Sequence, residues 1–479
     1  MQVKYPSDGR TAGWFRRLTA LAAAVALTAL CASPVVAQGT TAPLSGKRHS
    51  AYDARTAAVT TTTAPATNGT TAPTASNDTS DTSQTTTTTA ASTEIDENSK
   101  EAELAAETSS PQFNEDGTPN ITAGAAIVMD CQTGLILYGL NENAQMPMAS
   151  TTKIMTCILA LESGDIGRVV TVTDDCMDLL DGTQIGLKVG DTITLYDLCV
   201  TMMMYSGNDA ANTAAVAVSG SIPAFVSLMN EKAAELGMLN THFDTPSGLD
   251  QFSDGAHYSS AYDMALLGRY AMQNADFRDI VNFKVRNVYF GEYAKHGKSL
   301  YTHNYLMEGQ KFGYKGCDGI KTGVTNLAGQ CLVSHVTTDE GIQLVCVSLN
   351  NTNRWSDHKA MYEYAKSLYE QVDVDGSLSG FQPKVVGGTK STLRVNCETD
   401  AKLNILKTQA GNLKRELVYD SFLLAPIEKG DVVGYLQYSA NGMLLASYPI
   451  TAAESIQGNT DSWFTDCIRT LEQEAKDNE

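Results

Sequence analysis

The order of strand-like and helix-like segments between residues 120 and 375 is the feature that most constrains the fold. Residues 123–140 read as two strands around a CQTG turn, and residues 318–350 read as three further strands joined by short turns. Helical patterns fill the chain between these groups, and a last helix is expected at 355–371. Strands from both ends of such a segment can join one sheet that helices cover. We therefore expect an α/β (α+β) domain with an antiparallel sheet covered by helices.

Two places in the helical region carry candidate chemical groups. One helix is expected to begin near Ser150 and to stop at Gly164. Further on, a helical segment runs into the tripeptide SGN, after which the helical pattern resumes. Ser206 and Asn208 are thus expected in a sharp interruption between two helices. Ser and Asn also favour helix caps, so SGN alone is weak evidence for a site.

The N-terminal residues predict export. Two arginines precede a long apolar run that ends in CASPVVAQG, which is typical of a signal peptide over residues 1–37, cut after Ala37. The alternative is an uncleaved anchor, because the run approaches the ~20 residues that cross a bilayer. Leu30, just before Cys31, argues against a lipoprotein. We expect an extracytoplasmic bacterial protein, secreted or attached to the cell envelope.

Composition divides the rest of the chain. Residues 38–115 are rich in Thr, Ala, Ser and Asp with few large apolar side chains, and we expect a disordered linker there. The catalytic domain is expected at 116–376, a small all-β domain at 383–452 and a helical tail at 453–479. The tail would carry one apolar side and could dock or touch a membrane surface, although its acidic face weakens the membrane interpretation. That side comprises Trp463, Phe464, Cys467, Ile468 and Leu471.

Charge and cysteine spacing exclude several classes of function. The net charge of −20 argues against binding nucleic acid or an anionic membrane through a basic face. The ten cysteines form no CxxC pair and no His-rich metal pattern, so we expect no metal and no cofactor. Most cysteines lie in apolar stretches and are interpreted as core residues, with one unassigned disulfide left open.

The tetrapeptide STTK places Ser150 three residues before Lys153. Positions i and i+3 share a helix face, so the amine can lie against the hydroxyl. Lysine acts as a general base only if burial or a nearby cation lowers its pKa. Lys321, in the strand segment IKTG, is a candidate for that cation, and Gly323 would let a substrate backbone approach the strand.

Together these segments resemble a known family. The motifs Ser-x-x-Lys, Ser-x-Asn and Lys-Thr-Gly, in this order, are similar to the set of class A β-lactamases and penicillin-binding proteins. The stretches AAIVMDCQTGLILYGLNENAQMPMASTTKIMT, YSGNDAANTAA and DGIKTGVTNLAGQCLV resemble the low-molecular-mass penicillin-binding proteins, the serine D-alanyl-D-alanine carboxypeptidases of the peptidase S11 family. The resemblance covers about residues 120–375 and implies a penicillin-binding/β-lactamase-like fold. It extends, less specifically, to the family's C-terminal β module.

The resemblance implies a role for each motif residue. Ser150 would attack the peptide carbonyl between two terminal D-alanines, Lys153 would take its proton, and Ser206 would pass a proton to the leaving D-alanine. Asn208 would position the substrate amide.

The same resemblance implies the binding groups. Lys321 and Thr322 would bind the terminal carboxylate, and Arg354 would assist, unless it is only a surface arginine before a helix. The backbone N–H groups of Ser150 and Val324 would form an oxyanion hole. The partners implied are peptidoglycan stem peptides ending in D-Ala-D-Ala, with β-lactams as inhibitors.

The sequence leaves three alternative functions open. A serine β-lactamase shares the motifs, but its Glu-x-x-Leu-Asn element is matched only imperfectly by ELGMLN (235–240). A D,D-transpeptidase would use the same site with an amine in place of water. A catalytically silent wall-binding protein would not need all the motif residues. A metal or Ser-His-Asp site at His257, His303 and Asp318 lacks suitable spacing, and His257 is interpreted as a loop residue.

Overall fold

The computed structural model describes residues 110–253, 255–400, 402–459, 468–470 and 473. The predicted signal peptide and linker residues 38–109 lie outside these ranges. So do four of the five apolar residues predicted for the tail: Trp463, Phe464, Cys467 and Leu471.

Local hydrogen bonds hold residues 113–119 in a turn. The Asn114 backbone N–H donates to the Thr118 carbonyl at 2.9 Å, and the Thr118 hydroxyl donates to the Asp116 carboxylate at 2.6 Å. Gly117 has φ +81°, and Phe113 bridges to Pro119. Asp and Gly form such turns through local hydrogen bonds and positive φ.

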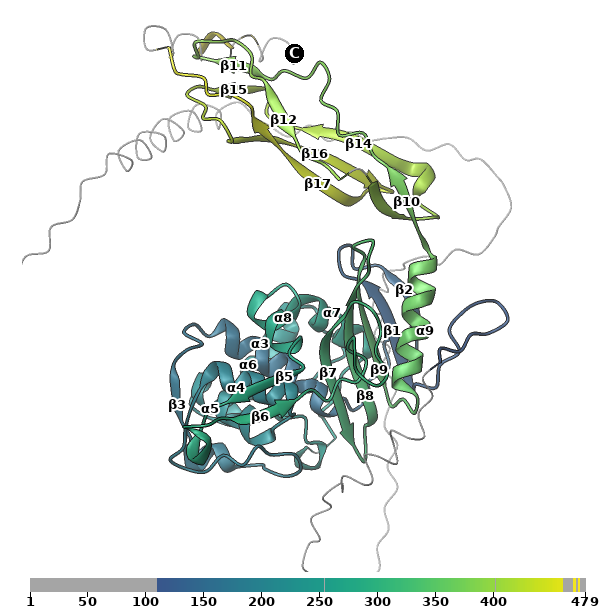
Figure 1. Ribbon diagram of the computed structural model, residues 1–479, viewed down its shortest axis with the longest axis vertical. Helices are drawn as coiled ribbons and strands as arrows, with labels where there is room; N and C mark the ends of the chain where they lie inside the picture. Colours follow the sequence, from purple (N-terminus) through teal and green to yellow (C-terminus); the bar gives the residue numbers. More distant parts are fainter. Residues whose placement is uncertain (1–109, 254, 401, 460–467, 471–472, 474–479) are drawn as a thin grey trace, which may run out of the picture. The chain divides into compact units, whose positions relative to one another are not determined.

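The central sheet contains five antiparallel strands. They are β1 (Ala125–Asp130), β2 (Ile136–Leu140), β7 (Cys317–Thr325), β8 (Gly329–Thr337) and β9 (Gln343–Leu349), in the order β2-β1-β9-β8-β7. The N-terminal pair thus joins the C-terminal strands through β1 and β9, as expected (Figure 1). All six residues of β1 are buried, because both faces of the sheet are covered.

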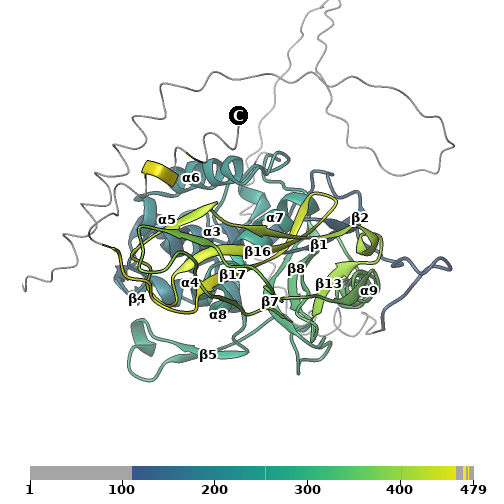
Figure 2. The ribbon, with the colours of Figure 1, turned by 90° about the horizontal axis from the view of Figure 1, so that it is seen from above.

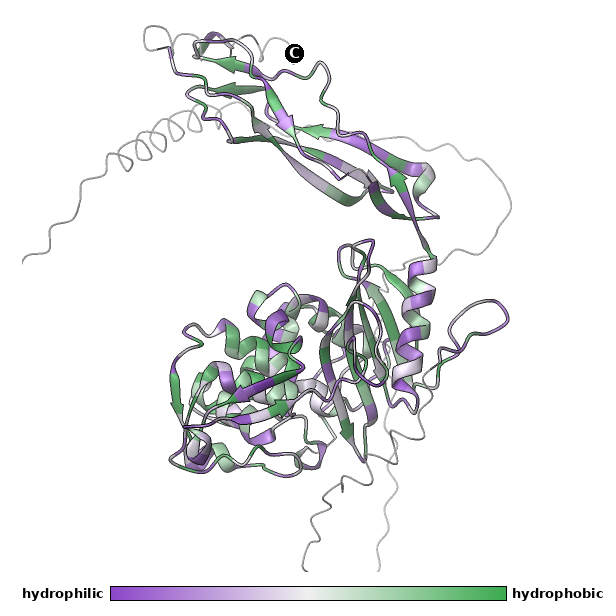
Figure 3. Cartoon of the chain, in the orientation of Figure 1, coloured by the Kyte–Doolittle hydropathy of each residue, from purple (hydrophilic) through white to green (hydrophobic). Residues whose placement is uncertain are grey.

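Helices cover the two faces of this sheet. Helix α7 packs on β1, β8 and β9, and α9 packs against the same three strands from the opposite side (Figures 1 and 2). The central strands and inner helices are largely hydrophobic in Figure 3, and most buried apolar residues join one cluster between the sheet and helices α3–α8. The helices are α3 (Lys153–Glu162), α4 (Leu195–Met204), α5 (Asn208–Ser219), α6 (Ile222–Glu235), α7 (Ala261–Ala271), α8 (Ala275–Val281) and α9 (Arg354–Ser367).

Side-chain caps begin several of these helices. The hydroxyls of Thr194, Ser221 and Ser260 accept backbone N–H groups at the starts of α4, α6 and α7, and Asn274 does the same for α8. Each cap satisfies a donor that the first helical turn cannot bond internally. Helix α3 lacks such a cap and instead continues a 3-10 turn, η1 (Ala149–Thr152), which contains Ser150.

The last helix ends earlier than the sequence predicts. Helix α9 stops at Ser367, and β10 (Tyr369–Asp373) follows, although the helical pattern was extended to Gln371. Strand β10 pairs with β13 (Lys402–Leu406), with Tyr369 opposite Leu406. This pairing with a distant strand outweighs the helical preference of the local residues.

Two small antiparallel strand pairs were also not anticipated: β3 (Val169–Thr171) with β4 (Thr192–Thr194), and β5 (Val285–Val288) with β6 (Lys298–Tyr301).

Beyond β10 the described chain is mostly β structure. A four-stranded sheet has the order β12-β17-β16-β14, and β11 and β15 form a parallel pair. Its buried apolar clusters are small, with Leu436, Tyr438 and Ile450 at the centre of one of them. The strands are β11 (Lys384–Val386), β12 (Val395–Cys397), β14 (Leu413–Val418), β15 (Phe422–Leu424), β16 (Val432–Ala440) and β17 (Met443–Ala452).

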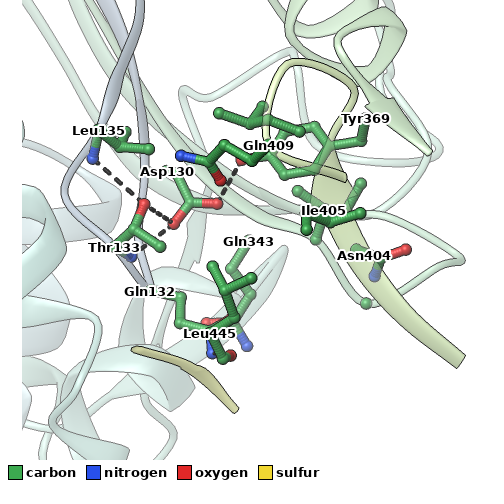
Figure 4. Close-up of a pocket in the computed structure, with 13 residues that line it drawn as sticks. Asp130, Gln132, Thr133, Leu135, Gln343, Tyr369, Asn404, Ile405, Gln409 and Leu445 are labelled. Atoms are coloured by element: carbon green, nitrogen blue, oxygen red, sulfur yellow. Dashed lines mark hydrogen bonds between the residues drawn. The ribbon is translucent and has the colours of Figure 1, made fainter. Parts of the chain in front are cut away.

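A pocket lined by residues of β1, β10 and β13 contains none of the motif residues (Figure 4). There Asp130 accepts hydrogen bonds from the Thr133 backbone N–H at 2.6 Å and its hydroxyl at 2.7 Å. The other carboxylate oxygen accepts from the Tyr369 hydroxyl at 2.5 Å. Both oxygens of Asp130 are thus engaged in tying the β1–β2 turn to β10.

Candidate active site

Lys153 and Ser150 meet at the junction of η1 and α3. The Lys153 Nζ lies 2.9 Å from the Ser150 Oγ, 2.6 Å from the Asn208 Oδ1 and 2.6 Å from the Ser247 carbonyl oxygen. Lys153 has no exposed surface. The two residues that the sequence paired are therefore in direct contact.

The surroundings of Lys153 favour its neutral form. Burial and the nearby Lys321 hold its pKa well below the usual lysine value, and Asp209 opposes them in part. A neutral amine has two N–H donors and one lone pair. Asn208 Oδ1 and the Ser247 carbonyl can only accept, so they take the two donors. The lone pair then faces the Ser150 hydroxyl, the one contact that can donate a proton.

The turn between α4 and α5 carries Ser206 and Asn208. Ser206 has φ +67°, a left-handed conformation that is uncommon for a residue other than glycine. Asn208 is the first residue of α5, one position further into the helix than predicted. Its Nδ2 donates to the Asp181 carbonyl at 2.6 Å and its backbone N–H to the Thr183 carbonyl at 2.8 Å. These contacts orient Oδ1 toward Lys153.

The sequence reasoning missed Asp209. This fully buried carboxylate accepts backbone N–H groups of Ile185, Gly186 and Leu187 at 2.8–3.0 Å. It therefore fixes the loop before β4 against the start of α5. An acidic residue in the first turn of a helix was the available signal, but nothing in the sequence identified its distant partners.

Strand β7 brings the KTG motif to Ser150. It is an edge strand of the central sheet, and a Cβ added to Gly323 would lie 3.0 Å from both the Ser150 backbone nitrogen and the Met148 carbonyl. Lys321 and Gly323 are buried, whereas Thr322 and Val324 are partly exposed. A side chain at 323 would thus separate β7 from the Ser150 backbone, which explains the glycine more closely than substrate approach alone.

Lys321 and Arg354 form the cationic part of the site. Lys321 Nζ donates to the Thr322 carbonyl at 2.8 Å. Burial, and secondarily Arg354, lower the pKa of Lys321 to about 7. Arg354 begins α9, is buried and stacks on Trp355, with 4.7 Å from its guanidinium carbon to the ring centroid. The reading of Arg354 as a surface arginine is therefore wrong.

The alternative histidine and aspartate residues have separate partners. His303 packs against Tyr205 at 5.7 Å, and Asp318 bonds His335 at 2.6 Å. His257 lies in a loop, as predicted, but its ring is buried and bonds Thr152. Within the described ranges there is no group of three His, Cys, Asp or Glu that could hold a metal ion. The described cysteines are free thiols, most of them buried.

Among the helices that the structure describes, none alone has the length and apolar character needed to cross a bilayer, and only the pair α5–α6, bent by 85°, meets that test jointly.

Comparison with known proteins identifies the family. Residues 112–353 match the peptidase S11 family, D-alanyl-D-alanine carboxypeptidase, and residues 380–457 match the C-terminal domain of penicillin-binding protein 5. The D-alanyl-D-alanine carboxypeptidase DacF of Bacillus subtilis is 31% identical over 346 residues, which are 70% of this chain and 86% of that protein. DacC of Escherichia coli is 30% identical over 71% of this chain and 85% of its own length.

Solved structures agree with this assignment. Penicillin-binding protein 5 from Haemophilus influenzae aligns with a TM-score of 0.50 and 27% identity, over 71% of this chain and 98% of that one. A Streptococcus pneumoniae protein, described as the peptidoglycan synthesis regulatory factor PBP3, has a TM-score of 0.60 at 23% identity, over 71% of this chain and all of that one, and supports the fold. The expected penicillin-binding fold with a C-terminal β domain is thus confirmed, and this chain belongs to the peptidase S11 family of D-alanyl-D-alanine carboxypeptidases.

Proposed function

We propose that this protein removes the terminal D-alanine from peptidoglycan stem peptides through an acyl-enzyme on Ser150. The observation that carries the proposal is the set of three contacts around Lys153, a buried amine with a lowered pKa whose Nζ lies 2.9 Å from the Ser150 Oγ. A serine alcohol becomes an effective nucleophile when such a base accepts its proton.

The first half-reaction forms the ester. Ser150 Oγ bonds to the carbonyl carbon of the penultimate D-alanine while its proton moves to Lys153 Nζ. The carbonyl oxygen takes up negative charge, which the backbone N–H groups of Ser150 and Val324 stabilise. Collapse breaks the C–N bond, and the proton that Lys153 took from Ser150 passes through Ser206 to the departing amine of D-alanine. The ester and free D-alanine result.

The binding step uses the edge of β7 and its cations. The substrate backbone lies along this edge, where Gly323 keeps the strand close to Ser150. The terminal carboxylate binds Lys321 and Thr322, with Arg354 adding positive charge. This carboxylate favours the protonated form of Lys321, whose pKa of about 7 is set by burial.

Water completes the cycle by hydrolysing the ester, which leaves a stem peptide one residue shorter and a free Ser150. β-Lactams present an acyl bond to the same serine and inhibit by forming a long-lived ester. A β-lactamase-type glutamate is not supported: Glu235 is mostly exposed at the end of α6 and pairs with Lys232 at 2.8 Å. Among the hydrogen bonds of the described residues, no carboxylate contacts Lys153 Nζ or the Ser150 hydroxyl.

We place the activity outside the cytoplasm, since the family acts on cell-envelope peptidoglycan. The proposal also includes a catalytic domain at 116–376 and a β domain at 383–452. It includes export directed by residues 1–37, and attachment through the N-terminal segment or the tail. Its support is the apolar run, the Thr-rich segment and the two family matches.

D-alanine release from diacyl-Lys-D-Ala-D-Ala tests the proposal. The exported chain should release D-alanine and be labelled by fluorescent penicillin, and Ser150→Ala should abolish both, with a rate loss of about 10⁴-fold or more. Labelling that survives Ser150→Ala would refute the nucleophile. Labelling without D-alanine release would favour a transpeptidase, and rapid penicillin turnover would favour a β-lactamase.

A further inference from the structure

The peptide group between Ala149 and Ser150 has a hydrogen-bonded support on its carbonyl side. Its N–H is the proposed oxyanion donor, and its carbonyl oxygen accepts the Thr152 hydroxyl at 2.8 Å. The same hydroxyl oxygen lies 2.8 Å from His257 Nε2. Thr152 has no exposed surface and His257 only 3%. Thr152 and His257 take no part in the proposed reaction steps, but their hydrogen bonds end on the peptide group whose N–H would bind the oxyanion.

The hydrogen-bond directions in this support are determined. The Asp244 backbone N–H donates to His257 Nδ1 at 3.0 Å, so Nδ1 is an acceptor. Burial lowers the pKa of His257 to about 4, so the ring is neutral at neutral pH and carries its proton on Nε2. Nε2–H then donates to Thr152 Oγ1, whose own proton goes to the Ala149 carbonyl. Each group therefore has one possible direction.

The backbone at Ala149 explains why support is needed. Ala149 has φ +49°, a left-handed conformation that costs free energy for a residue with a Cβ and persists only where neighbours enforce it. Gly248 approaches the same carbonyl so closely that an added Cβ would lie 2.0 Å from its oxygen and 2.8 Å from the Thr152 hydroxyl oxygen. The Ala149 carbonyl is thus fixed by the Thr152 hydroxyl and packed against the Gly248 backbone. Holding the carbonyl also holds the N–H, because the peptide group is planar.

We infer that Thr152 and His257 are positioning residues that aim the Ser150 N–H at the developing oxyanion. The chain from His257 through Thr152 to the Ala149 carbonyl keeps this strained peptide in one orientation. Donation to the carbonyl also polarises the amide and strengthens its N–H as a donor. The inference rests on the proposed function, because it assumes that Ser150 carries the acyl group.

Thr152→Val tests the inference with little change in shape. It removes the hydroxyl, and we expect kcat to fall by about tenfold or more, less than the ~100- to 1000-fold typical of deleting an oxyanion donor, while KM changes little. Thr152→Ser keeps the hydroxyl and should restore most of the rate. Thr156→Val is the matched control, because Thr156 is equally buried and its hydroxyl donates to the Pro246 carbonyl at 2.6 Å. It should lose similar stability but keep its rate.

A spectroscopic measurement separates positioning from general damage. In the ester formed on Ser150 by a β-lactam, weaker oxyanion hydrogen bonds raise the carbonyl stretching frequency. We expect a higher frequency in Thr152→Val and His257→Leu, the parental value in Thr156→Val, and recovery in Thr152→Ser. A parental frequency and kcat in folded Thr152→Val would overturn the inference.

The design also separates this inference from the proposed function. If the parent protein forms the β-lactam ester but releases no D-alanine, the carboxypeptidase proposal fails while the frequency comparison still decides the role of Thr152. If Thr152→Val does not fold, His257→Leu against His257→Gln, which keeps a side-chain N–H donor, gives the same comparison. Equal frequencies in these two variants would overturn the role of His257.

Discussion

Basic side chains are buried around Ser150 but exposed in the C-terminal β region. Around Ser150, Lys153 and Lys321 are buried, and burial lowers both pKa values, with a further lowering by Lys321 at Lys153 and by Arg354 at Lys321. In the β region the exposed Lys390 and Arg394 pair with the half-buried Glu454, and these pairs lower the pKa of Glu454 to about 2. Only the first arrangement changes which protonation state exists near neutral pH, which is what general-base catalysis requires.

Core size explains the difference. The catalytic region buries one large apolar cluster between a sheet and several helices, which can enclose charged groups and offset their desolvation. The β region has only small clusters of a few buried residues each. We therefore expect substitutions near Ser150 to change the reaction, and substitutions in the β region to change stability alone.

The largest effect is expected from Lys153→Met. It removes the base but keeps an apolar side chain of similar length, and the rate of Ser150 acylation should fall by about 10³-fold or more. Penicillin labelling kinetics measure this directly. Acylation at the parental rate would show that another group takes the serine proton.

Leu436→Ala is expected to have a large effect on stability and none on chemistry. Leu436 has no exposed surface, and truncating a buried leucine typically costs about 2–5 kcal/mol of unfolding free energy. Urea unfolding of the β region should shift accordingly, while kcat of the folded protein stays at the parental value. A matching fall in kcat would show that the β region contributes to catalysis.

The pH profile of kcat/KM should be bell-shaped. The acid limb reports protonation of the base Lys153. The alkaline limb reports loss of the Lys321 proton, since its pKa in the free enzyme is about 7 and the substrate carboxylate needs the charged form. Lys321→Arg keeps the charge at high pH and should move the alkaline limb upward by about one unit or more. An unmoved limb would assign it to another group.

The same lysine sets a weaker trend in stability. Lys321 has a pKa of about 7 in the folded chain against 10.5 in the unfolded chain, so the unfolded state binds more protons between these values. Stability should therefore rise with pH across this window through this group, and Lys321→Met should flatten the rise. Chemical unfolding at several pH values measures it.

The smallest effect is expected from Glu454→Gln. The Glu454 pKa is lowered to about 2 by exposed partners, so its ion pairs act above pH 4.5 and are lost as the pH falls through 2. Exposed pairs of this kind contribute little to stability. The unfolding midpoint near neutral pH should stay close to that of the parent, and a large shift would show that these pairs matter more than their exposure suggests.

Local patterns were sufficient for most elements and for the motif residues. Alternation and apolar runs predicted β1, β2 and β7–β9, and helical spacing predicted α3, which follows Ser150, and the helices on either side of Ser206. These features follow from side-chain direction in strands and helices, so neighbouring residues alone encode them. The predicted end of α9 was wrong because β10 forms by pairing with β13, whose residues lie 29 to 37 positions further along the chain.

Contacts between distant segments were beyond such patterns. The lowered pKa of Lys153 depends on its burial and on Lys321, and its contacts with Asn208 and the Ser247 carbonyl join segments that only folding brings within reach. The roles of Asp209 and of the His257–Thr152 hydrogen bond likewise depend on distance and burial. Residue types along the chain supplied Ser150 and Lys153 as a candidate nucleophile and base. The pKa shifts and hydrogen-bond contacts that would let them act as a pair arise from burial in a shared core, because desolvation acts on the folded site as a whole.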